Sequence, residues 1–162
     1  MNNIILIGMP GAGKSTIGVV LAKALGMQFL DTDLLIQKEK QSPLQVIIQT
    51  EGTQSFLNIE ETLLLSLACE KTVIATGGSA VLSKEAMAHL KAIGTVVYLD
   101  VPLETIEKRI KNMKTRGIVF DGVTSLRDVY NKRVPLYEQY ADLRIPCSGR
   151  FESTVQKILN HL

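Results

Sequence analysis

Short, mostly apolar runs alternate with longer segments of helical periodicity along this chain. The short runs stand at residues 4–7, 29–30, 73–75, 96–99 and 143–145. Runs of this kind are typical of parallel strands that are buried on both faces. The intervening segments carry apolar residues every three or four positions, which predicts helices over residues 15–25, 34–40, 43–51, 56–69, 83–90, 103–113, 125–140 and 151–162.

The alternation of strands with helices predicts an α/β fold with a parallel sheet and right-handed crossovers. Three residues mark expected boundaries within this pattern. Gly26 stands where a glycine often ends a helix, and Ser83 is a typical residue for the N-cap of the helix that follows it. Pro135 lies inside a helical pattern, so we expect it to interrupt the helix over residues 125–140.

Length and composition favour one domain, residues 1–162, because 162 residues with 46% hydrophobic side chains can bury one sizeable core. The formal net charge of +2 comes from 18 basic and 16 acidic residues and does not argue for nucleic acid or a membrane surface as a partner. No apolar run approaches the roughly 20 residues of a membrane-spanning helix. We expect a cytoplasmic protein, and a monomer.

The strongest motif is a glycine-rich loop directly after the first predicted strand. Residues 8–15 read GMPGAGKS and match the phosphate-loop pattern G-x-x-x-x-G-K-S in full. A buried strand precedes the loop and an amphipathic helix follows it, as the motif requires. Glycines let backbone N–H groups converge on phosphate oxygens, and the helix N-terminus adds partial positive charge. The predicted nucleotide-binding residues of this loop are Gly8, Gly11, Ala12, Gly13, Lys14, Ser15 and Thr16.

Within this loop, Lys14 is expected to reach the β- and γ-phosphates, and the Ser15 hydroxyl to bind Mg²⁺. The loop alone predicts ATP or GTP binding and leaves the reaction open. A guanine-reading Asn-Lys-x-Asp segment of switch GTPases does not occur in the sequence. A small-molecule kinase would further need acidic groups beside Mg²⁺, an acceptor pocket and basic residues that cover the transferred group.

Acidic residues follow the second predicted strand, at the sheet edge where ligands of open α/β folds bind. Asp31 and Asp33 are two positions apart, so both carboxylates can face one site, one toward Mg²⁺ and the other toward an acceptor hydroxyl. The alternative is that they cap the helix that begins near residue 34, and this alternative applies to Asp33 in particular. Both roles can coexist.

Further candidates lie at later strand ends and in a loop of low hydrophobicity. Gly77 and Gly78 follow the third strand and permit close approach of a substrate, or form a tight turn. Arg109 and Arg116 flank a loop that resembles a lid, although a solvated basic face is the alternative. Arg133 stands where it can clamp a carboxylate with two hydrogen bonds.

Taken together, these residues resemble the shikimate kinase family over nearly the whole chain. The resemblance rests on the phosphate loop, residues 31–33, residues 56–60, residues 76–78 and residues 133–137, which occur in the family's order and close to its spacing. It implies a three-layer P-loop NTPase fold with a five-stranded parallel sheet flanked by helices, like that of nucleoside-monophosphate kinases. It also implies acceptor-binding helices at about residues 34–62 and a lid at about residues 110–125.

The resemblance implies an ATP:alcohol phosphotransferase that converts shikimate to shikimate 3-phosphate, with ATP and Mg²⁺ as cofactors. By similarity, Asp33 binds the acceptor hydroxyls together with Gly77 and Gly78, and Asp31 assists Mg²⁺ through water. Arg133 would hold the acceptor carboxylate. Arg116 would be the lid arginine that meets the transferring phosphate, and Arg109 would lie against the adenine.

Three departures from the family pattern concern the acceptor site and the lid. The family carries an arginine that helps bind the substrate carboxylate where this chain has Leu57, and a glycine where this chain has Ser79. The lid sequence Arg-Pro-Leu-Leu appears here as RGIV at residues 116–119, and the span to Arg133 is somewhat short. A charge-assisted hydrogen bond contributes about 1.5–3 kcal/mol, so the loss of one arginine affects acceptor affinity.

The residues expected to bind ATP match the family pattern, whereas those expected to bind the acceptor depart from it. Four hypotheses follow. The first is a shikimate kinase that binds the carboxylate through Arg133 alone or through a residue such as Lys38, Arg127 or Lys132. The second is a related enzyme that phosphorylates another small polyol, hydroxy acid or sugar acid such as gluconate. The third is a nucleotide-binding regulatory protein without turnover, which the retained Lys14 and Arg116 argue against. The fourth is a nucleoside-monophosphate kinase, for which no second nucleotide-binding pattern is present.

Overall fold

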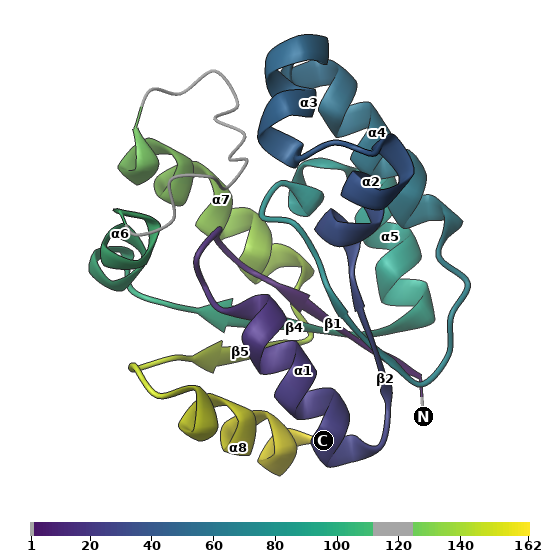
Figure 1. Ribbon diagram of the computed structural model, residues 1–162. Helices are drawn as coiled ribbons and strands as arrows, with labels where there is room; N and C mark the ends of the chain where they lie inside the picture. Colours follow the sequence, from purple (N-terminus) through teal and green to yellow (C-terminus); the bar gives the residue numbers. More distant parts are fainter. Residues whose placement is uncertain (1, 112–124) are drawn as a thin grey trace.

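The computed structural model describes residues 2–111 and 125–162. Its described strands form one parallel sheet in the order β2-β3-β1-β4-β5, drawn as arrows in Figure 1. The strands are β1 (Asn3–Ile7), β2 (Gln28–Asp31), β3 (Thr72–Ala75), β4 (Gly94–Asp100) and β5 (Leu143–Pro146). The predicted α/β class and the five-stranded parallel sheet are confirmed.

Helices connect successive strands and cover both faces of the sheet (Figure 1). Helices α1 and α8 pack against each other on one face, and α5 and α7 lie on the other face. The helices are α1 (Lys14–Leu25), α2 (Thr32–Lys40), α3 (Leu44–Glu51), α4 (Thr53–Ser66), the short 3₁₀ helix η1 (Ala80–Leu82), α5 (Lys84–Ile93), α6 (Leu103–Lys111), α7 (Leu126–Tyr140) and α8 (Phe151–His161).

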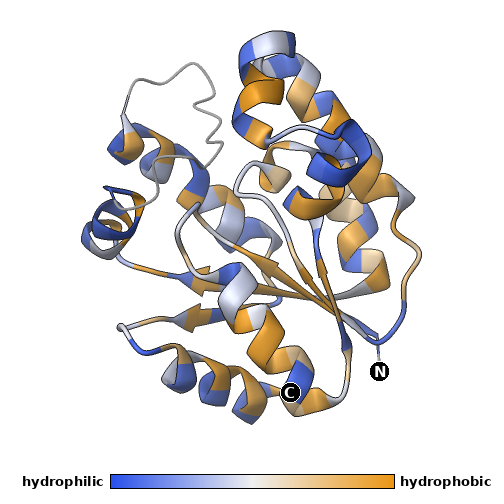
Figure 2. Ribbon diagram, viewed as in Figure 1, coloured by the Kyte–Doolittle hydropathy of each residue, from blue (hydrophilic) through white to orange (hydrophobic). Residues whose placement is uncertain are grey.

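Strand β1 lies in the middle of the sheet and is buried along its whole length. Its residue Ile5 is in register with Ile74 of β3 and with Val96 of β4, so it pairs on both edges. Figure 2 shows the same strands as a hydrophobic band between helices with mixed surfaces. Because a parallel strand covered on both faces has no solvated side, an uninterrupted apolar run is the sequence that this position requires.

Helices α2, α3 and α4 carry a small core of their own. Ile36, Leu44, Ile47 and Phe56 are buried against one another and form a cluster separate from the main core around β1. These helices include most of the predicted acceptor-binding segment, residues 34–62. Each of these helices has too few residues to be stable alone, so this local packing helps to hold the three together.

The predicted interruption at Pro135 is wrong, because α7 runs from Leu126 to Tyr140 with Pro135 inside it. A proline removes one backbone hydrogen bond and crowds the preceding turn, at a cost of about 3 kcal/mol in an exposed helix. Here Val129, Arg133 and Tyr137 are buried on both sides of the proline. Tertiary packing of this face therefore maintains the helix on both sides of Pro135. The predicted caps Gly26 and Ser83 are confirmed.

No described helix, in residues 2–111 or 125–162, has the length and apolar character needed to cross a membrane. The longest, α7, carries charged residues throughout its length.

The side chain of Asn3 joins the start of β1 to the segments that lead into β3 and β4. It is buried, donates to the carbonyl oxygens of Cys69 at 2.7 Å and Ile93 at 3.1 Å, and accepts from the backbone N–H of Thr72 at 3.0 Å. These bonds tie the start of β1 to the segments that enter β3 and β4. A hydrophobic side chain at this position would remove the partner of one buried and two partly buried backbone groups.

We therefore expect Asn3→Ala to lower the free energy of unfolding by about 2–4 kcal/mol, since each orphaned buried group costs about 1–3 kcal/mol. Urea denaturation measures the change. The control is Asn2→Ala, because Asn2 is exposed and surface substitutions usually stay within about 0.5 kcal/mol. Equal unfolding midpoints for the two variants would contradict the bridging role of Asn3.

Candidate active site

The phosphate loop leaves the carboxyl end of β1, between the ends of β3 and β4. Gly8, Gly11 and Gly13 have φ angles of 151°, 82° and 92°, which residues with a Cβ rarely adopt. At Gly8 a Cβ would also lie 3.0 Å from the carbonyl oxygen of Leu99. The glycines of the motif are thus required by the backbone path, and the path wraps the loop around the start of α1.

The N-terminus of α1 is arranged as an anion site. Its N-cap is Gly13, no side chain caps the first turn, and that turn contains no acidic residue. Backbone N–H groups at a helix start carry partial positive charge and favour a phosphate as their partner. The side chain of Lys14 is buried and donates to the carbonyl oxygens of Gly8 at 2.7 Å and Met9 at 2.9 Å, so its ammonium lies over the loop.

Ser15 and Asp31 bring two oxygen donors together beside this loop. The Ser15 hydroxyl donates to Oδ2 of Asp31 at 2.5 Å, and Oδ1 of Asp31 accepts from the backbone N–H of Leu34 at 3.1 Å. Asp31 is therefore the N-cap of α2 as well as a neighbour of Ser15, whereas Asp33 lies in the first turn of the helix. The N-cap role considered for Asp33 belongs to Asp31.

A hydroxyl and a carboxylate fit the chemistry of Mg²⁺, which usually takes one or two protein oxygens and completes its shell with phosphate oxygens and water. Across the described ranges, no group of three or more His, Cys, Asp or Glu side chains is placed to hold a metal ion. The residues present thus suit a metal that arrives with a nucleotide rather than a closed protein cage.

Asp33 and Glu60 converge on the backbone of Gly77. A Cβ built on Gly77 would lie 2.7 Å from Oδ1 of Asp33 and 2.6 Å from Oε2 of Glu60. These distances are shorter than real Cβ contacts, so only glycine leaves room for both carboxylates. Two acidic side chains from α2 and α4 therefore meet at the end of β3, next to the phosphate loop.

Glu60 is the more buried of the two carboxylates, at 2% exposure. Its Oε1 accepts from the Ser79 hydroxyl at 2.6 Å, and its Oε2 has no hydrogen-bond partner among the described residues. The pKa of Glu60 is raised from 4.5 to about 7, chiefly because burial disfavours the charged carboxylate and also because the charge of Asp33 is nearby. The Ser79 hydrogen bond and the positive charges of Arg133 and Lys14 lower this pKa in turn.

Arg133 of α7 is fully buried on the same side of the site. One turn further along α7, the Tyr137 hydroxyl donates to the carbonyl oxygen of Gly78 at 2.7 Å. Gly78 itself lies against the phosphate loop, since a Cβ there would be 2.6 Å from Cδ of Pro10. Helix α7, the turn after β3 and the phosphate loop are therefore in direct contact, and the predicted residues Gly77, Gly78 and Arg133 come together.

Arg109 reaches from α6 to the outer side of the phosphate loop. Its guanidinium donates to the carbonyl oxygen of Gly11 at 3.0 Å and lies 5.0 Å from the centre of the Phe151 ring, in cation–π geometry. The same ring faces Gly13, where a Cβ would be 2.6 Å from it. The first turn of α8 therefore forms part of the wall around the phosphate loop.

Comparison with known proteins identifies this arrangement. A family model described as shikimate kinase matches residues 10–162. The shikimate kinase of Neisseria meningitidis serogroup C is 38% identical over 162 residues, covering 98% of this chain and 95% of that protein. The shikimate kinase of Histophilus somni is 40% identical over 148 residues, covering 89% and 85%. The chain belongs to the shikimate kinase family.

Solved structures agree with this membership. The shikimate kinase from Acinetobacter baumannii in complex with shikimate superimposes on this family member with a TM-score of 0.91 at 35% identity, over 99% of this chain and 92% of that one. A gluconokinase from Sinorhizobium meliloti 1021 gives a TM-score of 0.54 at 14% identity, which shows a shared fold alone. The resemblance found in the sequence is confirmed, and so is the class of ATP-dependent phosphotransferase.

In this shikimate kinase family member, most predicted site residues meet at the carboxyl edge of the sheet. Thr16 lies in the first turn of α1 and is exposed. Arg116 and most of the predicted lid, residues 110–125, lie outside the described residues. Sequence reasoning gave no role to Ser79 as a partner of Glu60, or to Phe151. The available signal was Glu60 itself, an acidic residue four positions from both Phe56 and Leu64 on the apolar face of α4.

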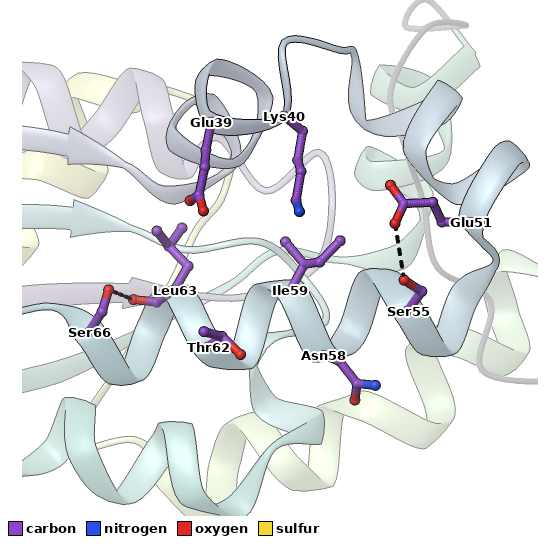
Figure 3. Close-up of a pocket in the computed structure, with 9 residues that line it drawn as sticks. All are labelled: Glu39, Lys40, Glu51, Ser55, Asn58, Ile59, Thr62, Leu63 and Ser66. Atoms are coloured by element: carbon purple, nitrogen blue, oxygen red, sulfur yellow. Dashed lines mark hydrogen bonds between the residues drawn. The ribbon is translucent and has the colours of Figure 1, made fainter.

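A separate groove of about 500 Å³ lies between α4 and the end of α2, and none of the predicted site residues line it. Figure 3 shows Glu39 and Lys40 on one side of it and α4 on the other, with Ser55 donating to Glu51 at 3.3 Å. This groove is therefore distinct from the place where the phosphate loop, the carboxylates and the arginines converge.

The raised pKa of Glu60 predicts a pH dependence of stability. Between pH 4.5 and about pH 7 the folded protein retains the Glu60 proton and the unfolded chain releases it, so the free energy of unfolding falls as pH rises. One pH unit corresponds to about 1.4 kcal/mol, so the Glu60 contribution amounts to roughly 3 kcal/mol. Above about pH 7 both states are ionised and this contribution stays constant.

Glu60→Gln does not titrate in this range, so its unfolding free energy should rise relative to wild type by roughly 3 kcal/mol from pH 4.5 to pH 8. Urea titrations of both proteins at the two pH values measure this difference. A difference that stays constant with pH would contradict the raised pKa of Glu60.

Proposed function

We propose that this chain transfers the γ-phosphoryl group of ATP to shikimate and releases ADP and shikimate 3-phosphate. The observation that carries the proposal is that Asp33 meets Gly77 beside the phosphate loop, while buried Arg133 lies on α7 one turn before Tyr137, which bonds to Gly78. A hydroxylated acid needs a carboxylate for its hydroxyls and a cation for its carboxylate, and this site offers both. The likeness to a structure of a shikimate kinase in complex with shikimate supports the same acceptor.

The ATP half of the site uses the phosphate loop. Backbone N–H groups of Gly11, Ala12 and Gly13 and the start of α1 hold the phosphates, and Lys14 turns its ammonium toward the β- and γ-phosphates. Gly8 lets the loop leave β1. Thr16 follows in the first turn of α1, and Arg109 lies where it can cover the adenine from α6. Mg²⁺, when bound with ATP, neutralises charge on the β- and γ-phosphate oxygens.

Ser15 is placed to bind that metal directly and Asp31 to bind it through water, as their mutual hydrogen bond brings both oxygens to one point. The acceptor half uses Asp33, Gly77, Gly78 and Arg133. Asp33 accepts the hydrogen bond of the reacting hydroxyl and is in position to take its proton, while Arg133 holds the acceptor carboxylate. A bond forms between the hydroxyl oxygen and the γ-phosphorus as the bond to the β-phosphate oxygen breaks.

Two segments complete the proposal. Helices within residues 34–62 form the acceptor side, and residues 110–125 act as a lid that brings Arg116 to the transferring phosphate and excludes water. Positioning and electrostatic stabilisation then carry most of the rate, as expected for phosphoryl transfer. We propose a cytoplasmic protein that acts as a monomer. Each element of the proposed site comes from this one chain, so the site does not need a second subunit to complete it.

A coupled ADP-release assay with Mg²⁺ and ATP tests the proposed function. The acceptors are shikimate, gluconate, other hydroxy acids, small polyols and nucleoside monophosphates, each assayed separately. We expect turnover with shikimate at a Michaelis constant in the usual range of about 1 μM to 1 mM, and none with Lys14→Ala. Turnover with another acceptor only, or ATP binding without turnover, would contradict the proposal.

Asp33→Asn separates the two halves of the site. It should lower kcat/KM for shikimate by about 10²–10⁴, the usual contribution of a positioned general base, while the Kd for ATP changes less than about twofold. Isothermal titration measures the Kd. The matched control is Asp128→Asn, an acidic residue in the first turn of α7, which should retain full activity. Equal loss of ATP binding and turnover in Asp33→Asn would show that Asp33 is structural.

A further inference from the structure

Ser79 and Leu57 lie in one small cavity beside the proposed acceptor site. The cavity has a volume of about 190 Å³ and separates α4 from the segment around η1. Glu60 also lines it, together with Glu61 and Ser83. Two positions that are far apart in sequence therefore share the surroundings of one buried carboxylate.

Glu60 is unevenly satisfied in this cavity. Its Oε1 has the Ser79 hydroxyl as donor, whereas its Oε2 points toward Gly77 and Asp33 without a described partner. Residue 57 lies one helical turn before Glu60 on the same face of α4, where a basic side chain would form an i, i+3 ion pair. Leucine cannot do so, and Leu57 instead packs against the small core of α2–α4.

Among the described residues, the cations whose charge lowers the pKa of Glu60 are Arg133 and Lys14, both at the active site. Both have other tasks under the proposed function, since Arg133 holds the acceptor carboxylate and Lys14 the phosphates. Glu60 and the acceptor carboxylate thus compete for Arg133. A neutral hydroxyl that donates to Glu60 reduces this competition, because it stabilises the buried carboxylate without using a positive charge.

We propose that Ser79 is a positioning residue for the acceptor, whose hydroxyl holds Glu60 in place of a cation at position 57 and so leaves Arg133 available to the acceptor carboxylate. The inference rests on the proposed function, and it makes the two unusual residues one coupled pair. Ser79 touches neither the phosphates nor the reacting atoms. Its effect is transmitted through Glu60 and Arg133.

A double-mutant cycle in the shikimate assay tests this coupling. Ser79→Ala should raise KM for shikimate about tenfold, equivalent to about 1.4 kcal/mol, with kcat and KM for ATP changed less than about twofold. Ser79→Thr retains the hydroxyl and should keep the wild-type KM. Leu57→Arg supplies the missing cation, so Ser79→Ala made in that background should raise KM less than about threefold.

The matched control is Ser83→Ala. Ser83 lines the same cavity, but its hydroxyl donates to Glu61, whereas the hydroxyl that donates to Glu60 is that of Ser79. This variant loses an N-cap and should melt at a lower temperature, with an unchanged KM for shikimate. It separates loss of stability from loss of positioning.

The outcomes are distinguishable. An unchanged KM in Ser79→Ala, or a defect of equal size with and without Leu57→Arg, overturns the inference while the proposed function stands. A Ser79→Ala protein that is folded by circular dichroism but has lost ATP affinity also overturns it, since the role would then be structural. Absence of turnover by the wild-type protein with shikimate overturns the proposed function and the inference with it.

Discussion

The active-site arrangement depends on one strand, β1, which is buried on both faces and paired on both edges. Its position in the middle of the sheet places the phosphate loop between the ends of β3 and β4. The end of β3 is held there by Thr76, whose hydroxyl and backbone N–H both donate to the carbonyl oxygen of Leu6, at 2.8 Å and 3.2 Å. Because all strands are parallel, every loop that could supply chemistry begins at this one edge.

Two carboxylates that would repel each other lie close together at the carboxyl end of the sheet. Asp33 and Glu60 approach the same glycine, with Lys14 and Arg133 as the neighbouring cations. A buried carboxylate without a full set of partners costs free energy, and such sites persist where a ligand completes them. The arrangement of charges at the site therefore lowers the free energy of unfolding, but it is preorganised, as electrostatic stabilisation of phosphoryl transfer requires.

Much of the fold could be predicted from the sequence because its signals are local. An apolar run predicts a buried parallel strand, and glycines at fixed spacing predict the phosphate loop. Both predictions need only residues that are neighbours in the sequence. The prediction that Pro135 interrupts the helix is wrong, because it rests on local propensity alone. The burial of Val129, Arg133 and Tyr137 maintains the helix despite the proline. The pairing of Ser79 with Glu60 joins two segments 19 residues apart, and no periodicity reveals which serine such a carboxylate will meet.

The contact between Phe151 and the phosphate loop has a consequence for biosynthesis. The loop follows β1 in the chain, yet the ring that faces Gly13 and contacts Arg109 belongs to α8, which is translated after the five described strands. A nascent chain that has exposed β1 to β4 possesses the glycines and the lysine but lacks this wall. The wall of the phosphate loop is therefore complete only after α8 has been translated and has packed against the loop.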